Sequence, residues 1–180
     1  MNTRKRQPQE GSIVNETIGA TSDVTAGGID AGQGLQPDKT KHIGTTRLTA
    51  EATELLIGAA RDAQAVAYAP YSLFPVGAAV LLSDGEIVSG CNIENASFGL
   101  TVCAERVAVF SAVAGGRMDI VAIALMTVGP SIYRPCGACR QVIAEFSRAD
   151  HPVIIISATN TGAWVTETIA DLLPQNFTLL

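Results

Sequence analysis

Positive charge is scarce in this sequence, and no lysine at all lies between residues 48 and 180. That region holds six arginines and twelve acidic residues, a net charge of −6. Residues 1–47 hold six basic and five acidic residues, a net charge of +1. Binding to a polynucleotide draws on many Lys and Arg contacts to phosphate groups. The charge balance therefore argues against nucleic acid as a partner.

Long apolar runs are also missing. No stretch reaches the eighteen or so apolar residues of a membrane helix. No apolar segment follows the basic opening "MNTRKRQPQE", as it would in a secretory signal. A Gly-rich phosphate-binding loop is absent as well. We therefore expect a cytoplasmic protein that contacts no membrane and whose four cysteines are reduced thiols.

Aromatic residues are absent from residues 1–47, where Gly, Thr, Gln and Asp dominate. Such a segment buries too little apolar surface to offset the entropy lost on ordering. We expect residues 1–47 to be a disordered N-terminal tail and residues 48–180 to form one folded domain.

The folded part has the pattern of an α/β layered domain, because five strand-like segments are interleaved with helical ones. The first helix begins with Thr49 as its N-cap and ends near Tyr68, because Pro70 disfavours helix before it. Further helices are expected at 103–114 and about 137–146, and a short helical turn at the start of 169–177. Strands are expected on either side of the turn at 83–85 and at 120–128, 152–158 and 163–169.

Three cysteines have the spacing of metal ligands. Cys136 and Cys139 form C-x-x-C at the head of one predicted helix, and Cys103 stands at the head of another. Helix N-termini favour anions and so stabilise thiolates. The sequence therefore predicts that the three thiols bind one zinc ion.

A fourth protein ligand is not evident. Cys91 lies within a strand pattern and is interpreted as a small core residue. His42 falls in the tail, and His151 precedes a proline in a connection. Three ligands and an open position are typical of a catalytic zinc, one per chain, whereas a structural zinc has four protein ligands.

Glu105 follows Cys103 by two residues. It is either an ordinary first-turn glutamate that the helix dipole favours or a base that moves protons beside the metal. Together with the three thiols, the second interpretation is preferred. Arg106 is predicted to donate to a ligand sulfur and offset the charge of three thiolates, whereas Arg140 is interpreted as a solvated cation.

The motifs C-A-E at 103–105 and P-C-x-x-C at 135–139 are the signature of zinc deaminases. The stretches "APYSLFPVGAAVLLSDGEIVSGCNIENASFGLTVCAER", "PCGACRQVIAEF" and "LLPQNF" closely resemble the small homotetrameric cytidine deaminases over roughly residues 50–178. The resemblance implies a three-layer α/β/α fold with a five-stranded mixed sheet. It also implies a hydrolase of pyrimidine salvage, which converts cytidine and 2′-deoxycytidine to the uridines and releases ammonia.

The resemblance assigns roles to single residues. Glu105 would be catalytic, and Cys103, Cys136 and Cys139 would bind zinc. The substrate contacts would be Asn92 and Glu94 with the ribose, Phe74 and the backbone of Ala104 with the base, and Phe177 with the base in a neighbouring subunit. Two positions depart from the family pattern: Arg134 replaces a usual serine, and Phe98 a common tyrosine.

Other substrates stay open at this point. Related zinc deaminases act on deoxycytidylate, for whose phosphate Arg134 is a candidate, or on blasticidin S, a cytosine nucleoside. A zinc-stabilised binding module without catalysis is the alternative from a different class. The open ligand position and Glu105 argue against that module.

Overall fold

The computed structural model describes residues 48–179, so the predicted tail lies outside the described residues. One mixed sheet has the strand order β2-β1-β3-β4-β5, in which only β3 and β4 run parallel. The elements are α1 (Ala50–Ala65), β1 (Gly77–Leu82), β2 (Ile87–Cys91), a 3₁₀ turn (Phe98–Leu100), α2 (Ala104–Ala114), β3 (Ile120–Thr127), α3 (Gly137–Glu145), β4 (Ile154–Thr159), β5 (Trp164–Thr168) and α4 (Ile169–Leu172).

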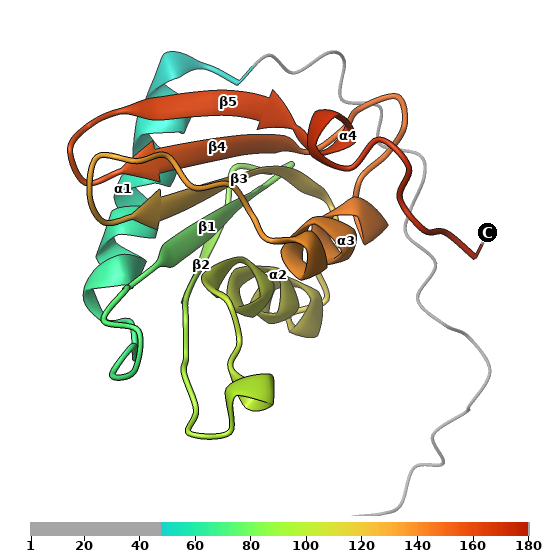
Figure 1. The fold of residues 1–180 in the computed structure, drawn as a ribbon. Helices are drawn as coiled ribbons and strands as arrows, with labels where there is room; N and C mark the ends of the chain where they lie inside the picture. The colour runs from blue at the N-terminus through green and yellow to red at the C-terminus, as the bar shows by residue number, and fades with distance from the viewer. Residues whose placement is uncertain (1–47, 180) are drawn as a thin grey trace, which may run out of the picture. The chain divides into compact units, whose positions relative to one another are not determined.

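Helices cover both faces of the sheet, with α1 on one side and α2 and α3 on the other (Figure 1). Successive side chains of the two central strands alternate between these layers, as strand geometry requires. On β3, Ala124 packs in the cluster beneath α1, and its neighbours Ile123 and Leu125 pack in the cluster beneath α2 and α3. The predicted three-layer α/β/α fold with a five-stranded mixed sheet is confirmed.

Helix α1 begins as the sequence predicts but ends earlier. The Thr49 hydroxyl accepts a hydrogen bond from the Ala52 N–H at 3.1 Å, which makes Thr49 the N-cap. The helix ends at Ala65, whereas the prediction placed its end near Tyr68. The backbone of Tyr68 pairs instead with the segment after β2, through Asn92 O and the Glu94 N–H. This pairing competes with the last helical turn.

Cys91 is half-buried, so the prediction that it is a core residue is wrong. The reason is that β2 is an edge strand and Cys91 is its last residue. None of the helices in the described part of the chain has the length and apolar character that crossing a membrane requires.

Helix α2 lies unusually close to β2 at one glycine. A Cβ atom on Gly90 would stand 2.5 Å from the Ala108 backbone nitrogen and 2.9 Å from the Val107 carbonyl carbon. These are backbone atoms, which cannot rotate away as a side chain can. Glycine at this position therefore sets how closely α2 approaches the sheet.

We predict that Gly90→Ala lowers the free energy of unfolding by about 1–3 kcal/mol, the usual effect of forcing extra volume into a packed core. The matched control is Gly58→Ala. Gly58 lies within α1 and has open space around its missing Cβ, so alanine should stabilise by about 0.5–1 kcal/mol. Urea unfolding of both variants checks this pair. Equal midpoints for the two would contradict the close approach.

Candidate active site

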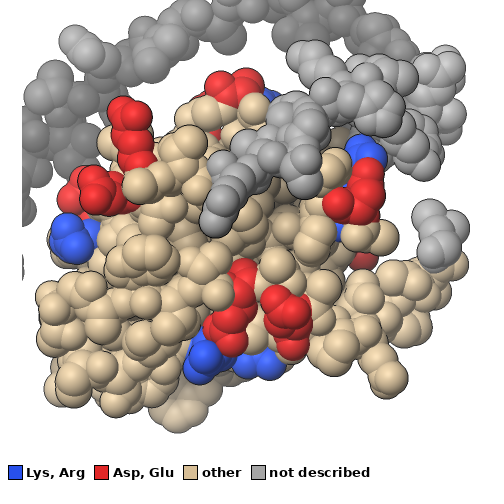
Figure 2. Space-filling view, turned by 90° about the horizontal axis from the view of Figure 1, so that it is seen from above, with Lys and Arg blue, Asp and Glu red and all other residues tan. Residues whose placement is uncertain are grey.

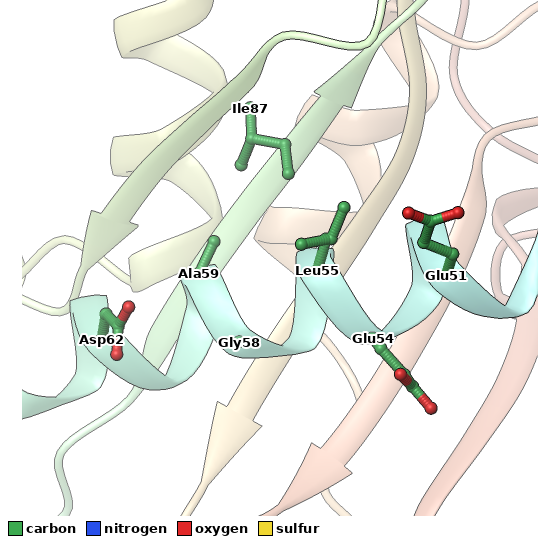
Figure 3. A pocket seen from close by; sticks show the side chains of 7 residues that line it. All are labelled: Glu51, Glu54, Leu55, Gly58, Ala59, Asp62 and Ile87. Carbon is green, nitrogen blue, oxygen red and sulfur yellow. The ribbon is translucent and has the colours of Figure 1, made fainter.

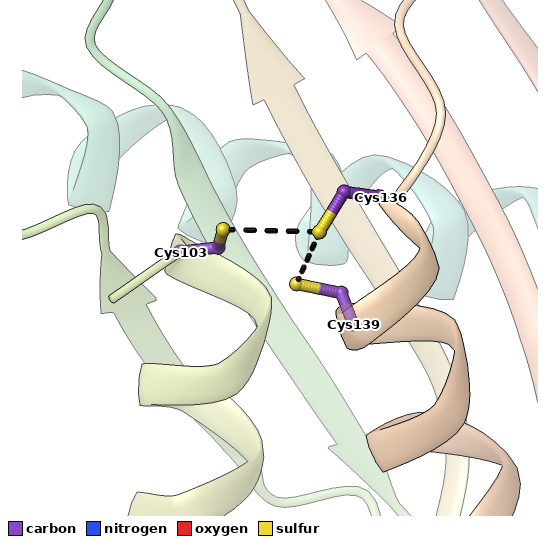
Figure 4. Close-up of side chains that lie close together, drawn as sticks. All are labelled: Cys103, Cys136 and Cys139. Carbon is purple, nitrogen blue, oxygen red and sulfur yellow. Dashed lines mark hydrogen bonds between the residues drawn. The ribbon is translucent and has the colours of Figure 1, made fainter. Parts of the chain in front are cut away.

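Two helix N-termini meet on the same face of the sheet and bring three thiols together. Cys103 is the N-cap of α2, Cys136 is the N-cap of α3, and Cys139 lies in the first turn of α3. The Sγ atoms of Cys103 and Cys136 are 4.0 Å apart, and those of Cys136 and Cys139 are 3.5 Å apart (Figure 4). All three sulfur atoms lie within 4.8 Å of one another.

This spacing fits zinc. With Zn–S bonds of about 2.3 Å, tetrahedral geometry separates two ligand sulfurs by about 3.8 Å. The two distances above lie on either side of that value. Neither N-cap cysteine uses its side chain to cap its helix, so both sulfurs remain available as ligands. The three cysteines are therefore able to hold one metal ion.

The surroundings of the thiols favour a thiolate at Cys103. A hydrogen bond with Cys139 and another from the Arg106 guanidinium lower the pKa of Cys103 to about 5. The pKa of Cys139 is raised, mainly because its thiol hydrogen-bonds to Cys103 and because it is buried. The groups around Cys103 therefore stabilise negative charge on its sulfur.

Glu105 is buried in the first turn of α2, with 5% of its surface exposed. Burial is the main reason why the pKa of its carboxyl is raised, and the nearby Cys103 adds to the effect. Glu51 has the matching first-turn position in α1 and is exposed, as expected of an acid that only interacts with the helix dipole. The burial of Glu105 beside the thiols is not explained by that dipole interaction.

The two arginines beside the thiols differ in their contacts. Arg106 donates from Nη2 to Cys103 Sγ at 3.7 Å and to Thr101 O at 3.3 Å. Arg140 was interpreted as a solvated cation, and this is wrong. Its Nε donates to Pro135 O at 2.7 Å and its Nη1 donates to Leu172 O at 3.0 Å. Arg140 is half-buried because it ties two backbone segments together.

Strand β2 ends at Cys91, so Asn92 and Glu94 lie just beyond it in the chain. Both side chains reach the same loop, at 71–76. The Asn92 amide accepts from the Val76 N–H and donates to Phe74 O, at 2.9 and 3.1 Å. Glu94 accepts from the backbone N–H groups of residues 71 and 72, at 2.8 and 3.2 Å, and from the residue 72 hydroxyl. The pair fixes the loop that carries Phe74.

The Phe74 ring packs edge-to-face against Tyr133, with ring centroids 5.2 Å apart. Tyr133 was missed by the sequence reasoning, although an aromatic residue three positions before Cys136 was a signal that it lies near the site. Ala104 is buried as the first residue of α2, where a helix N–H has no intrahelical acceptor. Phe98 is exposed and packs edge-to-face against Tyr71.

Phe177 and Arg134 lie at the outside of the molecule. Phe177 is 69% exposed, and its backbone is hydrogen-bonded to the side chain of Gln141 on α3. Arg134 does not stand free beside the thiols, because its Nε forms an ion pair with Glu167 of β5 at 2.6 Å.

A separate hollow of about 520 Å³ lies along α1, on the side of the sheet away from the thiols (Figure 3). Leu55, Ala59 and Ile87 face one another across it, and Glu54 points away. Its other lining residues are Glu51, Gly58 and Asp62. It lacks the grouped thiols and buried carboxyl of the first site, so the chemistry belongs to the α2–α3 side.

Known proteins resemble this chain in sequence and in fold. The chain is 49% identical over 126 residues to the cytidine deaminase of Halalkalibacterium halodurans, covering 69% of this chain and 93% of that protein. It is 48% identical over 125 residues to the cytidine deaminase of Sporosarcina psychrophila, covering 69% and 90%. A crystal structure of the cytidine deaminase from Burkholderia pseudomallei superposes with a TM-score of 0.65 at 44% identity, covering 69% of this chain and 98% of that one.

The family model of the cytidine and deoxycytidylate deaminase zinc-binding region matches residues 50–155. This range contains Cys103, Glu105, Cys136 and Cys139. Together with the grouped thiols and the shared fold, the match shows that this chain belongs to the cytidine and deoxycytidylate deaminase family.

Proposed function

We propose that this chain is a zinc-dependent hydrolase that deaminates cytidine and 2′-deoxycytidine. The observation that carries the proposal is the buried carboxyl of Glu105 beside three thiols spaced for one zinc ion. A buried carboxylate is costly unless it has a partner, and a structural zinc site needs no such group. The relatives named above are cytidine deaminases, which points to the same chemistry.

Cys103, Cys136 and Cys139 would hold the ion, which supplies a Lewis acid that activates water. Glu105 would accept the two protons of that water in turn, and would deliver one to N3 of the base and the other to the departing amino group. The water oxygen becomes the C4 carbonyl oxygen, and the amino group leaves as ammonia. One carboxylate can serve all of these transfers because it is buried and lies next to the ligands.

Groups of this chain offset the negative charge of the three thiolates. Three thiolates exceed the charge of Zn²⁺ by one, which weakens a Lewis acid. The Arg106 guanidinium donates to Cys103 Sγ, and both helix N-termini point their positive ends at the sulfurs. These groups withdraw negative charge from the ligands.

The substrate would lie between the thiols and the loop at 71–76. Phe74 lines the base pocket, and the free N–H of Ala104 contacts the pyrimidine. Asn92 has one N–H left after its two loop bonds, and the Glu94 carboxylate has free lone pairs, so both can bind the ribose hydroxyl. A sugar ligand pair of this kind favours ribonucleosides over blasticidin S.

Phe177 would complete the site of a neighbouring subunit in a homotetramer. An exposed aromatic ring on a fixed backbone suits this role. Because three reduced thiols are required, the enzyme would work in the reducing cytoplasm, within pyrimidine salvage.

Nucleic acid is an unsuitable substrate for this surface. Figure 2 shows the basic side chains on one face lying singly or beside acidic ones. Arg117 pairs with Asp84, Glu86 and Asp119, and Arg148 pairs with Asp150. Among residues 48–179, few cations are left for the phosphate contacts on which such binding depends.

We predict that Glu105→Gln retains one zinc per chain and lowers kcat by at least about 10²–10⁴-fold, because the base is lost while the thiols are untouched. Glu51→Gln, the exposed first-turn control, should keep normal turnover. Cys103→Ala should lose zinc. Metal analysis and cytidine kinetics measure all three. Loss of zinc in Glu105→Gln would make Glu105 a ligand or a support, and normal turnover with zinc bound would refute the proton transfer.

Arg134 is predicted not to select a phosphate, because Glu167 already neutralises it. Arg134→Ser should therefore leave the ratio of kcat/KM for deoxycytidine to that for deoxycytidylate within about twofold of the wild type. The wild-type enzyme should prefer the nucleoside. A ratio that shifts tenfold towards the nucleoside in Arg134→Ser would show that the arginine binds the nucleotide.

Phe177→Ala should raise KM for cytidine about 5- to 150-fold, which corresponds to the loss of one base–aromatic stack of about 1–3 kcal/mol. Zinc content should not change, because Phe177 is not a ligand. Sedimentation at assay concentration gives the oligomeric state. A fully active monomer would exclude a site shared between subunits.

A further inference from the structure

The side chain of Gln141 holds both backbone groups of Phe177. Its Nε2 donates to Phe177 O at 2.9 Å, and its Oε1 accepts from the Phe177 N–H at 3.3 Å. Only one orientation of the amide satisfies both groups, because the nitrogen can only donate and the oxygen can only accept. The Gln141 amide therefore pairs with the N–H and the carbonyl of Phe177, in the way that the backbone of a neighbouring β-strand would.

The ring of Phe177 is left outside this contact. Phe177 as a whole is 69% exposed although its backbone N–H and carbonyl are both hydrogen-bonded. A residue in an extended segment without such contacts would lose backbone freedom each time it bound a ligand. Here that freedom is already restricted before binding.

Helix α3 also holds the residue just before Cys136 and the start of the C-terminal segment. Arg140, next to Gln141 on α3, donates to Pro135 O just before Cys136 and to Leu172 O at the end of α4. Two consecutive residues of α3 thus tether the C-terminal segment at two points. The helix that carries Cys136 and Cys139 determines where Phe177 lies.

We propose that Gln141 is a positioning residue that pre-organises Phe177 for stacking on the base in a neighbouring subunit. It acts through the backbone of Phe177 and does not itself contact the substrate. The inference rests on the proposed deaminase function and on its shared site.

The test replaces Gln141 by Met, which has a similar length and helix propensity but can form neither hydrogen bond. KM for cytidine should rise about 3- to 10-fold, in keeping with two lost hydrogen bonds, while kcat changes less than twofold. Gln141→Ala gives a second variant with the same expectation. The control is Glu145→Gln on the same helix, where the exposed side chain has no hydrogen bond to the described residues, and it should match the wild type.

A double-mutant cycle separates positioning from a general effect on stability. In a Phe177→Ala background, Gln141→Met should raise KM no further, because the ring through which it acts is gone. An equal rise in both backgrounds would overturn the inference. So would an unchanged KM in Gln141→Met, or a Phe177→Ala variant with normal KM.

Hydrogen exchange gives a readout that does not depend on turnover. The Phe177 amide should exchange faster in Gln141→Met than in the wild type, while amides of the β3 core stay equally protected. Equal exchange of the Phe177 amide would overturn the inference whatever the kinetics. Failure of the wild type to deaminate cytidine would instead refute the proposed function, which the exchange experiment does not address.

Discussion

The meeting of two helix N-termini on one face of the sheet is the constraint on which the site depends. Cys103 and Cys136 are both N-cap residues, so a shift of either helix along its axis would separate the sulfurs. The close approach at Gly90 fixes α2 against β2, and α2 packs against α3. The sulfur spacing is therefore a property of helix packing and not of any flexible loop.

Hydrogen bonds around the thiols also fix the two segments that carry Phe74 and Phe177. Arg140 and Gln141 follow Cys139 directly on α3 and tether the C-terminal segment. On the other side, Asn92 and Glu94 fix the loop that carries Phe74. The groups proposed to bind substrate are thus held by residues that lie within three positions of β2 or of a thiol in the sequence. Such support keeps a site rigid before the substrate arrives.

Much of the fold was predictable because its signals are local. Apolar periodicity, the Thr49 cap and the turn at 83–85 each depend on a few neighbouring residues, and the structure reproduces the resulting elements. The predictions were wrong where the outcome depends on contacts between segments that are far apart in the sequence. Helix α1 ends early because Tyr68 pairs with residues beyond β2, and Cys91 is half-buried because β2 is an edge strand. Neither the partner of Tyr68 nor the order of the strands can be read from local pattern.

The sequence by itself determined the ligand chemistry, since C-A-E and P-C-x-x-C place three thiols and one carboxylate at two helix starts. Its charge balance also argued against polynucleotides. Only the tertiary structure decided which charges are free. Arg134 lies two positions before Cys136, yet it forms an ion pair with Glu167. Arg140 directly follows Cys139, yet it donates to two backbone carbonyls. The Arg134–Glu167 ion pair and the Arg140–Leu172 hydrogen bond join residues more than thirty positions apart, so they exist only once the sheet and helices have packed.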